Sequence, residues 1–231
     1  MTHPLLARAR AAVIDLDGTL VDTLGDFHVA LNAMLADLRL PGIEAAAVQR
    51  LVGKGSEHLI RSVLAEVGGD AGLYEDGWQS YQRHYLAING RHARLYDGVA
   101  EGLRCLQAQG IAMACLTNKP GNFARPLLQG MGIAAHFRHV FGGDAFEKKK
   151  PDPLPVLRSC EALGVAPAQV LVIGDSRNDA EAARAAGCPV VLVTYGYNHG
   201  EPVRDVPADG YVDALTALCS GWPAGGRAAG P

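Results

Sequence analysis

Hydrophobic residues follow two different patterns along the chain. Between Asp22 and Arg94 they recur every three or four positions, as on the buried face of an amphipathic helix. The clearest helices are predicted over 27–38 and 59–67, and weaker ones over 44–52 and 74–88. No strand is expected there, so the pattern predicts an all-helical segment.

The rest of the chain alternates short apolar runs with helical segments. Strands are predicted over 11–14, 111–116, 139–141, 170–173 and 190–193, and helices over 99–109, 123–129, 154–163 and 177–186. Continuous apolar runs are typical of strands buried on both faces of a parallel sheet. Short loops between strands and helices then predict an α/β fold, a doubly wound (Rossmann-like) parallel sheet with helices on both faces.

These two patterns give the expected domains. Residues 1–21 and 95–231 would form one discontinuous core domain, and residues 22–94 an inserted helical domain. The stretch 221–231 is rich in Gly, Ala and Pro, and we expect it to be a disordered tail.

Composition narrows the class of protein. Hydrophobic residues make up 48% of the 231 positions and charged residues 19%, which is typical of a globular protein. A formal net charge of −3 gives no reason to expect a nucleic-acid or membrane partner. No apolar run is long enough to cross a membrane, and residues 1–8 lack the core of a signal peptide. We therefore expect a cytoplasmic protein.

The five cysteines also favour a cytoplasmic protein. They are widely spaced and include no C-x-x-C pair: Cys105, Cys115, Cys160, Cys188 and Cys219. We expect buried free thiols in a reducing compartment rather than disulfides or a zinc site.

Polar residues follow three of the predicted strands. They are Asp15 and Asp17, Thr117 and Asn118, and Asp175 and Asp179. Each group alone is typical of a turn, of solvated acids or of a helix cap. Because parallel strands end along one edge of the sheet, where α/β folds bind ligands, their coincidence indicates a site.

The residue types suggest what this site holds. Asp15 and Asp17 point to the same side of an extended backbone, and Gly18 permits a sharp turn after them. Lys150, the last residue of a lysine run, precedes Pro151, which restricts its backbone. Clustered carboxylates repel one another unless cations are present. A lysine and a hard divalent ion would supply them, and oxygen donors favour Mg²⁺ over zinc.

In this order and spacing, the motifs resemble those of the haloacid dehalogenase superfamily. The first motif is Asp15-x-Asp17-Gly18-Thr19, the second Thr117, the third Lys150 and the fourth Gly174 to Asp179. The helical segment falls where that family inserts a helical cap. Within the superfamily the chain is most similar to bacterial phosphoglycolate phosphatases. The phrases that carry this likeness are LTNKP at 116–120, GGD at 142–144, KKPDP at 149–153, GDSRND at 174–179, AAGCP at 185–189 and TYGYN at 194–198.

The resemblance implies a role for each core residue. Asp15 would be the nucleophile that forms an aspartyl-phosphate, and Asp17 would protonate the leaving group and then activate water. Mg²⁺ would be held by Asp15, Asp175 and the backbone carbonyl of Asp17, with Asp179 reaching it through water. The phosphoryl group would be bound by Lys150, Thr117 and the Asn118 N–H. The implied reaction is Mg²⁺-dependent hydrolysis of 2-phosphoglycolate.

Substrate choice is expected to depend on the cap. The segment Gly53-Lys54-Gly55-Ser56 interrupts the helices, and a plain turn with an exposed lysine explains it equally well. Our hypothesis is that Lys54, with His58 or Arg61, binds the substrate carboxylate.

Other functions stay open. A capped phosphatase for a sugar phosphate, a capped phosphomutase and a non-enzymatic binding protein on this fold all fit the pattern. A dehalogenase needs neither Asp17 nor Asp175, so their presence counts against it. The sequence does not predict the oligomeric state.

Overall fold

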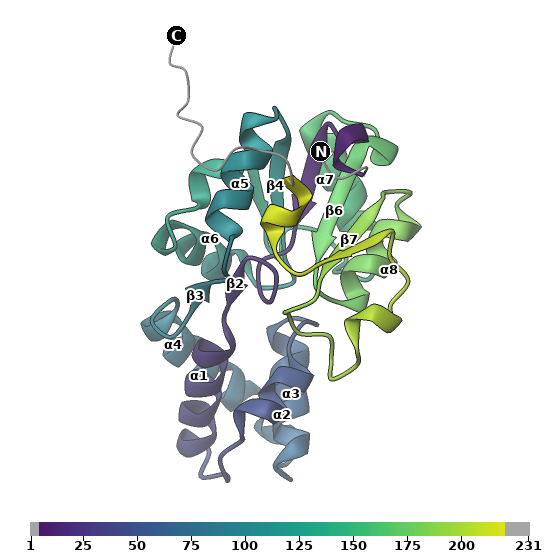
Figure 1. Cartoon of the computed structure of the whole chain (residues 1–231). Coiled ribbons are helices and arrows are strands. Elements are labelled where there is room, and N and C mark those ends of the chain that lie inside the picture. Colours follow the sequence, from purple (N-terminus) through teal and green to yellow (C-terminus); the bar gives the residue numbers. More distant parts are fainter. Residues whose placement is uncertain (1–4, 220–231) are drawn as a thin grey trace.

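The computed structural model describes residues 5–219, so the predicted tail at 221–231 lies outside the described residues. In Figure 1 the larger lobe is built on a twisted sheet, and the smaller lobe consists of helices α1 to α4. Between the lobes runs the short strand pair β2 and β3.

The larger lobe contains one six-stranded sheet with the order β5-β4-β1-β6-β7-β8. Its strands are β1 (Ala11–Ile14), β4 (Ala112–Leu116), β5 (His139–Phe141), β6 (Val170–Gly174), β7 (Val190–Val193) and β8 (Gly210–Val212). All pair in parallel, and Ile14 of β1 lies opposite Cys115 of β4 and Ile173 of β6. The predicted α/β fold with a parallel sheet is confirmed.

Both faces of the sheet are covered by helices, and alternate residues of each strand point to opposite faces. Ala12 and Ile14 of β1 belong to one hydrophobic cluster, whereas Ala11 and Val13 belong to another. Helices α5 (Val99–Ala108) and α6 (Gly121–Gly130) contribute to the first, and α7 (Leu154–Leu163) and α8 (Arg177–Ala185) to the second. This packing explains why the strands are continuous apolar runs.

The smaller lobe, called the cap below, has a hydrophobic core of its own. It comprises α1 (Leu24–Asp37), α2 (Ala45–Leu51), α3 (Ser56–Glu66) and α4 (Tyr74–Ile88). Tyr81 and Tyr85 are fully buried in its centre. Phe123 and Tyr197 of the larger lobe pack into the same cluster, so the two lobes share a contact surface.

Some short elements were not predicted from the sequence. Strands β2 (Val21–Asp22) and β3 (Arg94–Leu95) pair antiparallel where the chain enters and leaves the cap. With two residues each they are too short to show periodicity, as are the single 3₁₀ turns. These turns are Leu6–Arg8, Ala71–Leu73, Ala134–His136, Pro167–Gln169, Val203–Asp205 and Leu215–Cys219. The domain limits 1–21, 22–94 and 95–231 stay a prediction.

The expectation that every cysteine is a free thiol was wrong. Cys105 on α5 and Cys219 at the end of the turn Leu215–Cys219 form a disulfide. These residues are 114 positions apart, and only the packing of α5 against that turn brings them together. Cys115, Cys160 and Cys188 are free and buried, as predicted.

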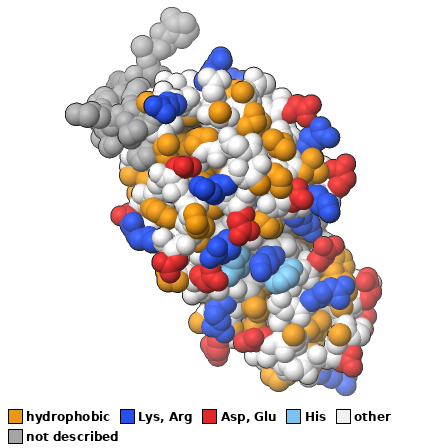
Figure 2. Space-filling model, turned by 90° about the vertical axis from the view of Figure 1, so that its right-hand side faces the viewer, with side chains coloured by type: hydrophobic (Ala, Val, Ile, Leu, Met, Phe, Trp, Pro, Cys, Tyr) orange, Lys and Arg blue, Asp and Glu red, His pale blue; other side chains and the backbone are white. Residues whose placement is uncertain are grey.

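The surface shows no field of one sign on the face drawn in Figure 2, where acidic and basic side chains are interspersed over both lobes. Within residues 5–219, none of the helices combines the length and the apolar character needed to cross a membrane.

Candidate active site

The residues predicted at the strand ends line one cavity between the sheet and the cap. Asp15, Asp17, Thr117, Lys150 and Asp175 all contribute to its wall. The cap closes the opposite side with Phe27, Val52, Gly53, Gly55, Ser56 and Leu59. Residues far apart in the sequence therefore meet here because β1, β4 and β6 are neighbours that end at the same edge.

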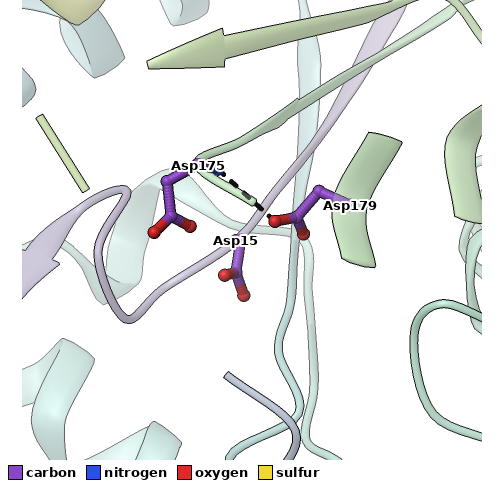
Figure 3. A group of neighbouring side chains, drawn as sticks. All are labelled: Asp15, Asp175 and Asp179. Carbon is purple, nitrogen blue, oxygen red and sulfur yellow. Dashed lines mark hydrogen bonds between the residues drawn. The ribbon is translucent and has the colours of Figure 1, made fainter. Parts of the chain in front are cut away.

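Three carboxylates form the acidic centre of this cavity. Figure 3 shows Asp15 and Asp175, which follow the adjacent strands β1 and β6, beside Asp179 from the first turn of α8. One oxygen of each lies within 4.8 Å of the others. Burial and the neighbouring Asp179 carboxylate raise the pKa of Asp15 to about 7, against the opposing charge of Lys150, and they raise the pKa of Asp175 well above its usual value. An all-oxygen cluster whose negative charge is this unfavourable fits a hard divalent cation such as Mg²⁺.

Lys150 supplies the positive charge opposite this cluster. Its Nζ lies 2.8 Å from Asp15 Oδ1 and 2.6 Å from Asp179 Oδ1, and it donates to the Leu116 carbonyl at 2.9 Å. Burial lowers the pKa of Lys150, but the two carboxylates outweigh burial and raise it. The ammonium group is therefore charged and surrounded by three oxygens.

Asn118 fixes the backbone of Lys150. Its Oδ1 accepts from the Lys150 N–H at 3.0 Å, and its Nδ2 donates to the Lys150 carbonyl at 2.9 Å. The three lysines of the run differ: Lys148 is exposed, Lys149 pairs with Glu57 at 3.0 Å, and only Lys150 is buried.

Asp179 both begins helix α8 and orients Lys150. Its Oδ2 accepts from the Ser176 N–H at 3.2 Å, as in a capping box, and also from Ser176 Oγ at 2.7 Å. Its Oδ1 contacts Lys150. The helix cap thus involves Ser176 and Asp179, which leaves the Asp175 carboxylate facing the cavity.

Two loops that contain glycine enclose Asp175. Its Oδ1 accepts from Thr19 Oγ1 at 3.0 Å, and its Oδ2 accepts from the Tyr197 N–H at 2.6 Å. A Cβ at Gly18, where φ is +83°, would lie 2.1 Å from Asp175 Oδ2, and one at Gly196 would lie 2.3 Å from Asp175 Cβ. Glycine is required at both positions because any side chain would displace this carboxylate.

Asp17 has a separate environment, which the sequence reasoning missed. Its Oδ1 accepts from Lys119 Nζ and from Thr23 Oγ1, both at 2.8 Å. Lys119 is only 4% exposed, and its Nζ lies 4.3 Å and 4.8 Å from the ring centres of Phe27 and Tyr85. Its position directly after Thr117-Asn118 was the available signal, because residues that follow a strand end also face the site.

Several contacts tie the cap to the larger lobe, and two of them reach the same backbone carbonyl. Asn118 Nδ2 and Asn178 Nδ2 donate to the Gly53 oxygen at 3.0 Å and 3.2 Å. Tyr197 makes a second link, because its hydroxyl accepts from the N–H groups of Thr23 and Leu24 at the start of α1. These contacts hold the cap loop over the acidic cluster.

The three cap residues proposed for substrate binding lie elsewhere. Lys54, His58 and Arg61 are exposed, and none of them lines the cavity formed by the described residues. The Arg61 guanidinium stacks 3.6 Å above the Tyr74 ring. Burial and the nearby charge of Lys54 lower the pKa of His58. Their role in specificity stays a prediction.

Comparison with known proteins identifies the family. Residues 9–187 match the model of the haloacid dehalogenase-like hydrolases. The chain belongs to this family. The acidic cluster and Lys150 of this hydrolase therefore come from the same matched region.

Relatives and solved structures agree with the family. A phosphoglycolate phosphatase from Thiobacillus denitrificans is 46% identical over 209 residues, which cover 89% of this hydrolase and 92% of the relative. One from Nitrosospira multiformis is 42% identical over the same length and the same shares of each chain. The crystal structure of a predicted phosphoglycolate phosphatase from Haemophilus somnus superposes with a TM-score of 0.87 at 32% identity, covering 92% of this hydrolase and 97% of that chain.

Proposed function

We propose that this hydrolase is a Mg²⁺-dependent phosphate monoester hydrolase that converts 2-phosphoglycolate to glycolate and phosphate. The observation that carries the proposal is the cluster in which Asp15 contacts Lys150 and lies beside the carboxylates of Asp175 and Asp179. The names of relatives that are 46% and 42% identical support the choice of substrate.

Asp15 acts as the nucleophile in this proposal. A carboxylate oxygen of Asp15 attacks phosphorus, the bond from phosphorus to the glycolate oxygen breaks, and an aspartyl-phosphate forms. Lys150 holds the carboxylate at 2.8 Å and favours its ionised form against the effect of burial. Attack by water on phosphorus then releases phosphate and restores Asp15.

Asp17 moves the proton. Lys119 and Thr23 both bind its Oδ1, so its Oδ2 can face the reacting groups. In the first step Asp17 donates a proton to the departing glycolate oxygen, and in the second it accepts a proton from the attacking water. One carboxyl group serves both steps because the first leaves it in the ionised state that the second needs.

The phosphoryl oxygens need donors and a cation. The Thr117 hydroxyl accepts from the Lys119 N–H at 3.1 Å, which leaves its own proton to donate, and the Asn118 N–H would be a second donor. The carboxylates of Asp15 and Asp175 and the Asp17 carbonyl would hold Mg²⁺, with Asp179 reaching it through water. When bound, Mg²⁺ offsets the negative charge of the phosphoryl group.

Phosphate release from a panel of esters tests the proposal. The panel contains 2-phosphoglycolate, a sugar phosphate and ethyl phosphate, each with Mg²⁺ or with EDTA, for the wild type and Asp15→Asn. We expect wild-type turnover to be fastest on 2-phosphoglycolate, to need Mg²⁺ and to be lost in Asp15→Asn. Faster release from the sugar phosphate would assign a different substrate, a rearranged phosphate ester as product would indicate a phosphomutase, and no turnover of any ester would refute the activity.

A further inference from the structure

Lys119 lines the cavity, and in the proposed reaction it only holds Asp17. Resting on the proposed function, we propose that the Lys119 ammonium binds the carboxylate of the substrate and so determines specificity. The recognising charge would then come from the loop after β4 rather than from the cap.

Only one cationic side chain of the cavity is free to bind the substrate carboxylate, as the contacts of the described residues show. Among the described residues that line it, only Lys119 and Lys150 are positively charged. Lys150 already has three oxygen neighbours within 2.9 Å, from Asp15, Asp179 and Leu116. Its Nζ donates to Leu116 and Asp179 and forms an ion pair with the proposed nucleophile Asp15, so Lys150 serves the phosphoryl end of the cavity. Lys119 Nζ contacts one carboxylate, Asp17, and has protons left for a second anion.

The surroundings of Lys119 fix its ammonium at this place. The rings of Phe27 from α1 and Tyr85 from α4 lie within 4.8 Å of Nζ, and the side chain is almost entirely removed from water. Aromatic faces attract a cation but do not replace its hydration, so a buried ammonium with one carboxylate partner gains from a second. Both rings belong to the cap, so Lys119 is held between the two lobes.

The position of Lys119 matches the shape of the substrate. In 2-phosphoglycolate a single methylene group separates the ester oxygen from the carboxylate. Asp17 faces that ester oxygen in the proposed reaction, and Lys119 contacts the same Asp17 carboxyl at 2.8 Å. A cation beside the proton donor is therefore within reach of a carboxylate one carbon away. The exposed Lys54 does not line the cavity.

Comparing substrates with and without a carboxylate tests the proposal. With 2-phosphoglycolate and with ethyl phosphate as substrates, kcat/KM is measured for the wild type, Lys119→Met and Lys119→Gln. Lys148→Met, which removes an exposed cation, is the matched control, and Lys54→Met tests the alternative residue. Losing one partner of a buried charged pair costs about 2 kcal/mol or more, so Lys119→Met should lose about 30-fold in preference for 2-phosphoglycolate.

The ratio of the two rates separates recognition from damage to the site. Removing Lys119 also leaves Asp17 without its ion pair. This loss slows the hydrolysis of both esters and does not change the ratio of their kcat/KM values. Equal losses on both esters in Lys119→Met and Lys119→Gln, or a lost preference in Lys54→Met alone, overturn the proposal. If Lys119→Met does not fold, Lys119→Gln decides in the same way. A wild type that hydrolyses ethyl phosphate but shows no preference for 2-phosphoglycolate refutes the proposed substrate, and with it the role of Lys119, before any variant is compared.

Discussion

Replacing Asp15 by Asn should remove part of the stability that the metal-free protein loses as the pH rises to about 7.5. Burial, together with Asp179 and Asp17, raises the pKa of Asp15 from 3.8 to about 7, although Lys150 opposes the shift. Between these two values the folded protein binds a proton that the unfolded chain has lost. The free energy of unfolding therefore falls as the pH rises through this window, and Asn, which does not ionise, removes the effect.

The size of the effect follows from the width of the window. Each pH unit between the two pKa values is worth about 1.4 kcal/mol. From about pH 5.5 to the folded pKa of about 7 the wild type should lose about 2 kcal/mol through Asp15 alone. The free energy of unfolding of Asp15→Asn, relative to that of the wild type, should rise by that amount between about pH 5.5 and pH 7.5.

Urea unfolding in EDTA measures this difference. Wild type and Asp15→Asn are compared at both pH values, with Asp97→Asn at an exposed position as the matched control. Groups that titrate equally in both proteins cancel in the comparison. Adding Mg²⁺ at the higher pH should stabilise the wild type more than Asp15→Asn. A difference in unfolding free energy that stays constant between the two pH values would contradict this prediction.

Two further predictions concern the cap. Asp26 is fully buried and accepts from the N–H groups of Gly90 at 2.6 Å and His92 at 2.8 Å. Asp26→Ala leaves these two donors without an acceptor and should lower the free energy of unfolding by about 2 kcal/mol. An unchanged urea midpoint would contradict this. Asn178→Ala removes one of the two bonds to the Gly53 carbonyl, worth about 1 kcal/mol, so amide exchange in the loop 52–55 should become about fivefold faster. Unchanged exchange there would show that Asn178 does not hold the loop.

The elements with a strong hydrophobic pattern could be predicted from the sequence. Strands β1 and β7 and helix α7 have the predicted bounds, because a buried strand is a continuous apolar run and an amphipathic helix repeats its apolar face. Strand β8 was missed because one of its three residues is Gly210, a residue type that is depleted in strands. The disulfide between Cys105 and Cys219 was missed because it depends on tertiary packing.

The site divides in the same way. Asp15, Thr117 and Asp175 could be placed together because they follow strands of one parallel sheet, which end at one edge. The environment of Lys119 could not be predicted, since it depends on how the helical cap brings Phe27 and Tyr85 over the loop. Spacing along the chain does not show how two lobes meet. For the same reason, the sequence could not show that Lys54 lies outside the cavity.

Trapping the intermediate on Asp15 tests the proposed mechanism most directly. Wild-type protein is mixed with 2-phosphoglycolate and Mg²⁺, quenched in acid within the first turnovers and digested, and the peptides are analysed by mass spectrometry. A nucleophilic Asp15 should carry one added phosphoryl group, which is absent with EDTA and absent in Asp15→Asn. Phosphate release without any phosphorylated peptide, or a phosphoryl group on another residue, would contradict the proposed mechanism.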